Sequence, residues 1–173
     1  MIKHPLAARW ELPIPIEIGK ISAGDWASNV PDRLYADGRM GVAIGEDIAT
    51  ARRALDEAIG TACYDDAWLR DQPATVEWWG GQFASGITEV DSSIISTVQR
   101  CHADVSRAPQ TMWATPYGSD LRLMQGIGKV PTIHYRPGNA ELAHGPRECV
   151  SIDELLTATR ALALIAIDHC GLS

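Results

Sequence analysis

The chain has 173 residues, 46% of them hydrophobic and 21% charged, with a formal net charge of −7 from 15 basic and 22 acidic residues. This composition is typical of a globular protein, and an acidic chain without a basic cluster argues against nucleic acid or an anionic membrane as a partner. No apolar run reaches the length that spans a bilayer, and no secretory-type leader is recognisable, so we expect a cytoplasmic location.

The first half of the chain begins with two predicted strands. Isoleucines alternate with other residues over 13–22, which predicts a strand that Gly19 interrupts. Residues 33–44 predict a second strand, interrupted around Asp37 and Gly38 by a hairpin or a bulge.

A helix is predicted from residue 46 to about residue 62, with two acidic residues favouring the dipole of its first turn. Its apolar stripe consists of Ile48, Ala51, Leu55, Ala58 and Ile59. The segment up to Pro73 continues or restarts this helix, and 75–83 predicts a strand. The order strand, strand, helix, strand indicates a split βαβ sandwich without its first strand and helix.

The second half predicts elements that close an α/β sheet. A helix follows a possible N-cap at Asp91, a short helix lies within 116–128, and a strand covers 129–135. The stripe of the first helix is Ile94, Ile95, Val98, Cys101, His102 and Val105.

The last helix is predicted to begin with a capping box of Ser151 and Glu154 and to end before Gly171. Its predicted buried face is Ile152, Leu155, Leu156, Thr159, Leu162, Ala163, Ala166, Ile167 and Cys170. The boundary between the two halves falls near residues 86 to 91.

His144 is the best candidate for chemistry. It lies in a polar loop just before the last helix, where an α/β enzyme presents a metal ligand, although a single loop histidine is more often simply solvated. Glu148 either orients this loop and fixes the histidine tautomer, or is a first-turn carboxylate of the helix.

Asp120 and Arg122 follow Gly118 and Ser119, in a loop that can approach a ligand closely. The Arg122 guanidinium suits a substrate carboxylate, and the alternative is a surface ion pair with Asp120.

Other candidates carry structural interpretations. We expect one of Trp78 and Trp79 in a core and the other over an interface, and His102 and His169 to be structural, while His134 is a weak second ligand candidate. The cysteines are far apart and are expected to be reduced and mostly buried: Cys63, Cys101, Cys149 and Cys170.

Common catalytic patterns are missing from the sequence. It contains no P-loop, no G-x-G-x-x-G, no Ser-His-Asp order, no H-E-x-x-H and no Glu-Glu pair. One histidine cannot hold a hydrolytic metal, because catalytic zinc takes about three protein ligands.

The succession of motifs nevertheless resembles the C-terminal portion of the acetylornithine deacetylase / succinyl-diaminopimelate desuccinylase-like deacylases, from about residue 11 to 171. These are zinc metallopeptidase relatives with a two-metal site. The motifs are GDWASNVPD, GRMGVAIGED, VEWWGGQFASG, YGSDLRL, VPTIHYRPG, AELAHGPRE and LLTATRALALIAIDHCG.

The resemblance implies an α/β and α+β architecture. Residues 1–88 would be the second half of a ferredoxin-like lid, or dimerisation, domain, and 89–173 the C-terminal α/β part of the catalytic domain. His144 matches a metal ligand, Arg122 the arginine that meets the substrate carboxylate, and Gly138 the last glycine of a YGPG loop.

Two departures from the family pattern are visible. Arg136 stands where that loop usually has a glycine, which puts the shape of the loop in doubt. The other metal ligands, the glutamate base and the lid histidine of the family have no counterpart here, so no catalytic residue is assigned.

Two hypotheses follow. In the first, the chain is a C-terminal fragment of a zinc-dependent deacylase, with cobalt or manganese as alternative metals, and it is inactive alone. Together with an N-terminal half in trans, it would act on a small N-acyl amino-acid-like substrate. In the second, it is a non-catalytic module that forms a homodimer through the lid. A compact new site of His144 and His134 has no supporting ligand spacing. The family resemblance also predicts instability, because without the rest of the sheet the helices of 94–105 and 152–167 would have exposed apolar faces.

Overall fold

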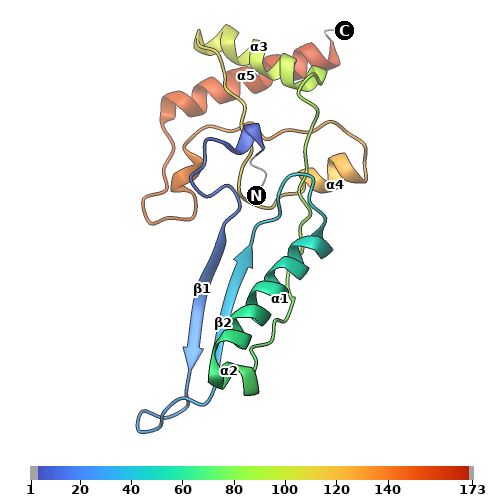
Figure 1. The fold of residues 1–173 in the computed structure, drawn as a ribbon. Coiled ribbons are helices and arrows are strands. Elements are labelled where there is room, and N and C mark those ends of the chain that lie inside the picture. Colours follow the sequence, from blue (N-terminus) through green and yellow to red (C-terminus); the bar gives the residue numbers. More distant parts are fainter. Residues whose placement is uncertain (1–3, 172–173) are drawn as a thin grey trace. The chain divides into compact units, whose positions relative to one another are not determined.

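The computed structural model describes residues 4–171 and contains, over that range, one two-stranded antiparallel sheet and five α-helices (Figure 1). The chain forms two compact units: the first runs up to Gly86 and includes Trp113–Arg122, and the second contains Ile87–Met112 and the residues from Leu123 onward. The fold is therefore mixed α and β, as expected. The assignment of 1–88 and 89–173 to a lid and a catalytic segment stays a prediction.

A hairpin in the first unit confirms the two predicted strands. Strand β1 (Ile16–Ala23) pairs antiparallel with β2 (Leu34–Met40). The predicted interruption of the first strand at Gly19 is confirmed, because Gly19 is an extra residue in β1 opposite the step from Gly38 to Asp37. The interruption predicted in the second strand at Asp37 and Gly38 is therefore a bulge in its partner. Such a bulge adds one residue to one strand and bends the ladder.

The bulge at Gly19 keeps one face of the hairpin apolar. Without the extra residue, Ile21 would point to the opposite side from Ile16 and Ile18, and with it all three share a face. This apolar hairpin face, made of Ile16, Ile18, Ile21 and Leu34, is exposed. The other face carries two cross-strand ion pairs, Glu17–Arg39 and Lys20–Asp37.

Helix α1 (Ile48–Asp65) confirms the predicted helix. Asp47 caps it by accepting a hydrogen bond from the Thr50 N–H at 3.2 Å. The stripe faces inward as predicted at Ile48, Ala51, Leu55 and Ile59, whereas Ala58 is exposed. The chain then restarts rather than continues the helix, because Asp66 caps a separate short helix, α2 (Ala67–Asp71).

The strand predicted over 75–83 does not form. The segment after Pro73 runs along α1 instead: the Ala74 N–H donates to Cys63 Sγ at 3.4 Å, and the Arg52 guanidinium lies 5.3 Å from the Trp78 ring centroid. A strand needs free backbone partners, and the backbone groups of a helix interior are already paired within the helix. Neither Trp78 nor Trp79 is buried, so the expectation of a core tryptophan is wrong.

The second unit is built on two helices packed against each other, α3 (Ser93–Ser106) and α5 (Ile152–Cys170) (Figure 1). The predicted stripe of α3 is confirmed at its centre by three buried residues: Ile95, Val98 and Cys101. The N-cap is Ser92 rather than Asp91, and its side chain makes no capping hydrogen bond.

The face of α5 that packs inward is not the predicted one. Ala158 and Ala161 are buried, whereas Leu155 and Leu162 on the predicted face are about half exposed and Ile152 is 74% exposed. Small side chains let the two helices approach closely, and the bulky residues remain outward. The expected exposure of an apolar face on α5 is thus confirmed, whereas the stripe of α3 is largely covered.

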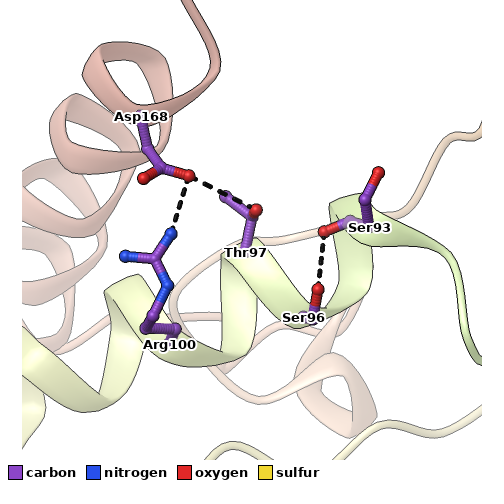
Figure 2. Close-up of polar contacts among 5 residues, drawn as sticks. All are labelled: Ser93, Ser96, Thr97, Arg100 and Asp168. Atoms are coloured by element: carbon purple, nitrogen blue, oxygen red, sulfur yellow. Dashed lines mark hydrogen bonds and ion pairs between the residues drawn. The ribbon is translucent and has the colours of Figure 1, made fainter. Parts of the chain in front are cut away.

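Polar contacts close one end of this helix pair. Asp168 of α5 forms an ion pair with the Arg100 guanidinium of α3 at 2.7 Å and lies 3.4 Å from the Thr97 hydroxyl (Figure 2). Hydrogen bonding to Asp168 raises the pKa of Arg100 above its usual value. The helix ends as predicted, with Gly171 donating its N–H to the Ile167 carbonyl at 2.9 Å.

The second missing strand is the one predicted over 129–135. Here the Thr88 side chain takes the place of a neighbouring strand: its hydroxyl donates to the Thr132 carbonyl and accepts from the Thr132 N–H at 3.1 Å. A single hydroxyl pairs one residue and cannot extend a ladder, so the segment stays irregular. Helix α4 (Leu121–Gly126) forms where a short helix was expected.

The four cysteines are all free, as expected, but only Cys63 and Cys101 are buried. Cys149 and Cys170 are exposed, so the prediction of mostly buried thiols holds for half of them. Within residues 4–171, no helix combines the length and apolar character that crossing a membrane requires. The cytoplasmic location stays a prediction.

Candidate functional site

The predicted histidine lies in an exposed loop of the second unit, just before α5. His144 has a φ of 62°, in the left-handed region that side chains other than glycine seldom adopt. Its backbone N–H donates to Glu148 Oε2 at 2.8 Å. Glu148 thus binds the main chain of the loop and not the imidazole. It also lies before α5, which begins at Ile152, so it is not a carboxylate of the first helical turn. Of the two roles considered for Glu148, the structure therefore favours orientation of the loop.

A second carboxylate holds the start of the same loop. Gly138 has a φ of 86°, and its N–H donates to Glu154 Oε2 at 3.1 Å. Glu154 thus binds the loop instead of completing the predicted capping box with Ser151, which makes no side-chain cap bond. Two carboxylates therefore bind the main chain of this loop, one at Gly138 and the other at His144 itself.

Glycine is favoured at Gly138 by conformation, and a side chain there would also displace Arg136. A Cβ there would lie 3.1 Å from Arg136 Nη2, in addition to the unfavourable φ. Arg136 folds back on its own loop, with its Nε–H donating to the Pro137 carbonyl at 3.0 Å. The arginine that departs from the family pattern is therefore accommodated beside Gly138.

Arg122 belongs to the other unit. Its guanidinium carbon lies 4.4 Å from the centroid of the Phe83 ring, and its Nε is buried without a hydrogen-bond partner among the described residues. The predicted alternative, a surface pair with Asp120, is not among the ion pairs of residues 4–171.

The segment that carries Arg122 is tied to the N-terminal residues. The Ala114 N–H donates to the Leu6 carbonyl at 2.8 Å, and the Trp10 indole N–H donates back to the Ala114 carbonyl. The Arg9 guanidinium lies 4.1 Å from the Trp113 ring centroid. Backbone and aromatic contacts together fix the start of the loop that leads to α4.

A histidine–tyrosine pair was not predicted. His102 Nδ1 lies 2.7 Å from the Tyr135 hydroxyl, with the two rings edge to face at a centroid distance of 5.8 Å. Burial raises the pKa of Tyr135, so the phenol stays neutral and serves as a hydrogen-bonding group. This contact supports the structural role expected for His102, and the irregular segment 129–135 hides it from pattern analysis.

The residues present do not by themselves make a metal centre. Across residues 4–171, no group of three or more His, Cys, Asp or Glu side chains is arranged to hold an ion. The exposed imidazole of His144 suits zinc as a ligand, but a catalytic zinc takes about three protein ligands. His144 is a single candidate ligand within this chain.

Comparison with protein families identifies a match over most of the chain. The profile of "Peptidase family M20/M25/M40" matches residues 14–168, which include Arg122, Gly138 and His144. No curated protein matches the chain.

Proposed function

The chain belongs to peptidase family M20/M25/M40, and from this membership we propose that it contributes to an amide hydrolase of the acetylornithine deacetylase / succinyl-diaminopimelate desuccinylase type, acting on small N-acyl amino acids. The membership itself indicates a metal-dependent hydrolase or peptidase. The observation that carries the proposal is the His144 loop, whose main chain is held in an unfavourable conformation by Glu148.

Three residues have roles in this proposal. His144 is one ligand of a zinc ion, with cobalt or manganese as alternatives, since a neutral imidazole suits all three. Arg122 binds the substrate carboxylate with its planar guanidinium, and Gly138 lets the loop beside the site turn closely. The remaining ligands and the general base come from residues outside this chain, in an N-terminal half that acts in trans or within a longer protein.

Hydrolysis assays test this proposal. The chain alone, supplied with zinc, cobalt or manganese, is expected to release negligible acetate from N-acetyl amino acids. Adding a family N-terminal half should restore activity, and His144→Ala should abolish it, whereas the matched change His169→Ala in the exposed end of α5 should not. Robust, chelator-sensitive hydrolysis by the chain alone would contradict the fragment proposal.

A second candidate is a non-catalytic module that forms a homodimer, and the apolar hairpin face favours it. Ile16, Ile18, Ile21 and Leu34 are each more than half exposed, and an exposed patch of this kind usually marks an interface. The outer edges of β1 and β2 are also available for pairing with another strand.

Light scattering at micromolar concentration tests the second candidate. We expect a dimer that Ile18→Glu dissociates, while Ser22→Glu on the polar face of the same strand leaves it intact. His144→Ala should not affect association. A monomeric wild-type chain would remove this candidate and leave the first one standing.

A further inference from the structure

The only phenylalanine of the sequence lies under the proposed carboxylate-binding arginine. Phe83 follows the Gly80–Gly81 pair, and its ring centroid is 4.4 Å from the guanidinium carbon of Arg122. Both residues belong to the first unit, so the contact lies within one compact body. A cation this close to an aromatic ring is attracted by the electron-rich face.

Glycines on both segments make room for this contact. A Cβ at Gly81 would overlap the Phe83 ring edge, and one at Gly118 would lie 3.1 Å from Phe83 Cγ. A Cβ at Gly86 would lie 3.0 Å from the backbone nitrogen of Arg122. The ring is thus placed between main-chain segments that only glycine allows to approach so closely.

The environment of Arg122 restricts how it meets an anion. Its Nε is buried and has no partner among the described residues, whereas the side chain as a whole is only half-buried. Because the Nε side of the guanidinium is buried, a ligand can reach only the two terminal nitrogens. Two parallel N–H donors match the two oxygens of a carboxylate, provided that the plane of the guanidinium is fixed.

We propose that Phe83 is a positioning residue: its ring fixes the plane of Arg122 so that the terminal nitrogens bind a substrate carboxylate. This inference rests on the role of Arg122 in the proposed function, and it adds a residue that touches no substrate. It explains why an aromatic side chain lies at a site where two glycine-rich segments meet.

Ligand titrations with the full chain test this role. The probes are N-acetylalanine and its C-terminal amide, which differ in the carboxylate alone, and binding is followed on the arginine Nε–H signals by nuclear magnetic resonance. The wild type should bind the acid more tightly than the amide. Phe83→Leu should weaken binding of the acid by roughly three- to ten-fold, as expected for a lost cation–π contact, and should move the Arg122 Nε–H signal downfield.

Two further variants separate positioning from general stability. Phe83→Tyr keeps the aromatic face and should restore both affinity and signal position. Trp79→Leu removes an aromatic side chain that is 72% exposed in the same segment and should change neither.

Three results would overturn the inference: equal affinity in Phe83→Leu, an unmoved Arg122 signal, or no preference of the wild type for the acid. Acetate release in the presence of an N-terminal half tests the hydrolase separately. If that release fails while carboxylate-dependent binding persists, the proposed function falls and the role of Phe83 stands.

Discussion

The contact between α3 and α5 gives a sharp test of the packing. Ala161 is completely buried and Ala158 nearly so, on the helix that packs against α3. Replacing Ala161 by leucine adds three carbons at a position with no exposed surface. The same replacement at Ala163, which is exposed on the same helix, is the matched control.

The expected magnitude follows from the difference between these two sites. Alanine and leucine have nearly equal helix propensity, so the control should change the free energy of unfolding by less than about 0.5 kcal/mol. Overpacking a well-packed contact typically costs about 1–3 kcal/mol, because side chains or backbone must shift to admit the added volume. We therefore expect Ala161→Leu to be destabilising by about 1–3 kcal/mol relative to Ala163→Leu.

Urea denaturation can locate this effect. All six tryptophans lie in the first unit, so tryptophan fluorescence reports that unit alone, while far-ultraviolet circular dichroism also follows α3 and α5. Ala161→Leu should lower the midpoint of the dichroism transition. If the two leucine variants unfold at the same urea concentration, Ala161 does not lie at a tight helix contact and the packing described above is wrong.

Two further predictions concern Gly138 and Tyr135 of the second unit, the first with a control in α1 of the first unit. Gly138→Ala should be destabilising by about 1–3 kcal/mol because of the positive φ. As the control, Gly60→Ala, inside α1 with open space around it, should be stabilising by about 0.5–1 kcal/mol. Urea midpoints that move in the same direction for the two variants would contradict this prediction. Because the folded-state pKa of Tyr135 is raised, the unfolded chain loses the phenol proton first, so this tyrosine's contribution to stability should fall as pH rises from about 10. Tyr135→Phe, which removes the hydrogen bond to His102, should cost about 1 kcal/mol at pH 7 and lessen that alkaline loss, and an unchanged alkaline slope would contradict the assignment.

Helix positions were predictable because periodicity is local. The apolar spacing in 48–65, 93–106 and 152–170 needs only neighbours along the chain to indicate a helix. The hairpin was predictable for a similar reason, since its two strands follow each other closely. The pattern in α5 did not predict which face of the helix packs inward. Leucines outnumber the buried alanines in this helix, so apolar spacing indicates the leucine face.

The two missing strands show the limit of local patterns. Residues 75–83 and 129–135 contain strand-forming side chains, but a strand also requires a second backbone with free donors and acceptors. In one case the neighbour is helix α1, and in the other it is the hydroxyl of Thr88. Strand propensity therefore predicted two strands that do not form, because it does not predict a pairing partner.

The same distinction separates the two candidate residues, His144 and Arg122. The contacts that hold His144 all come from nearby residues, since Glu148 is four positions away and Glu154 binds the loop at Gly138. A loop with local supports of this kind can be anticipated from sequence, and the role of His144 as a metal ligand stays a prediction. Arg122, by contrast, is held by Phe83, which a different glycine-rich segment supplies, and no spacing rule links the two. Sequence motifs can therefore identify the arginine, whereas the group that orients it is visible only once the chain is folded.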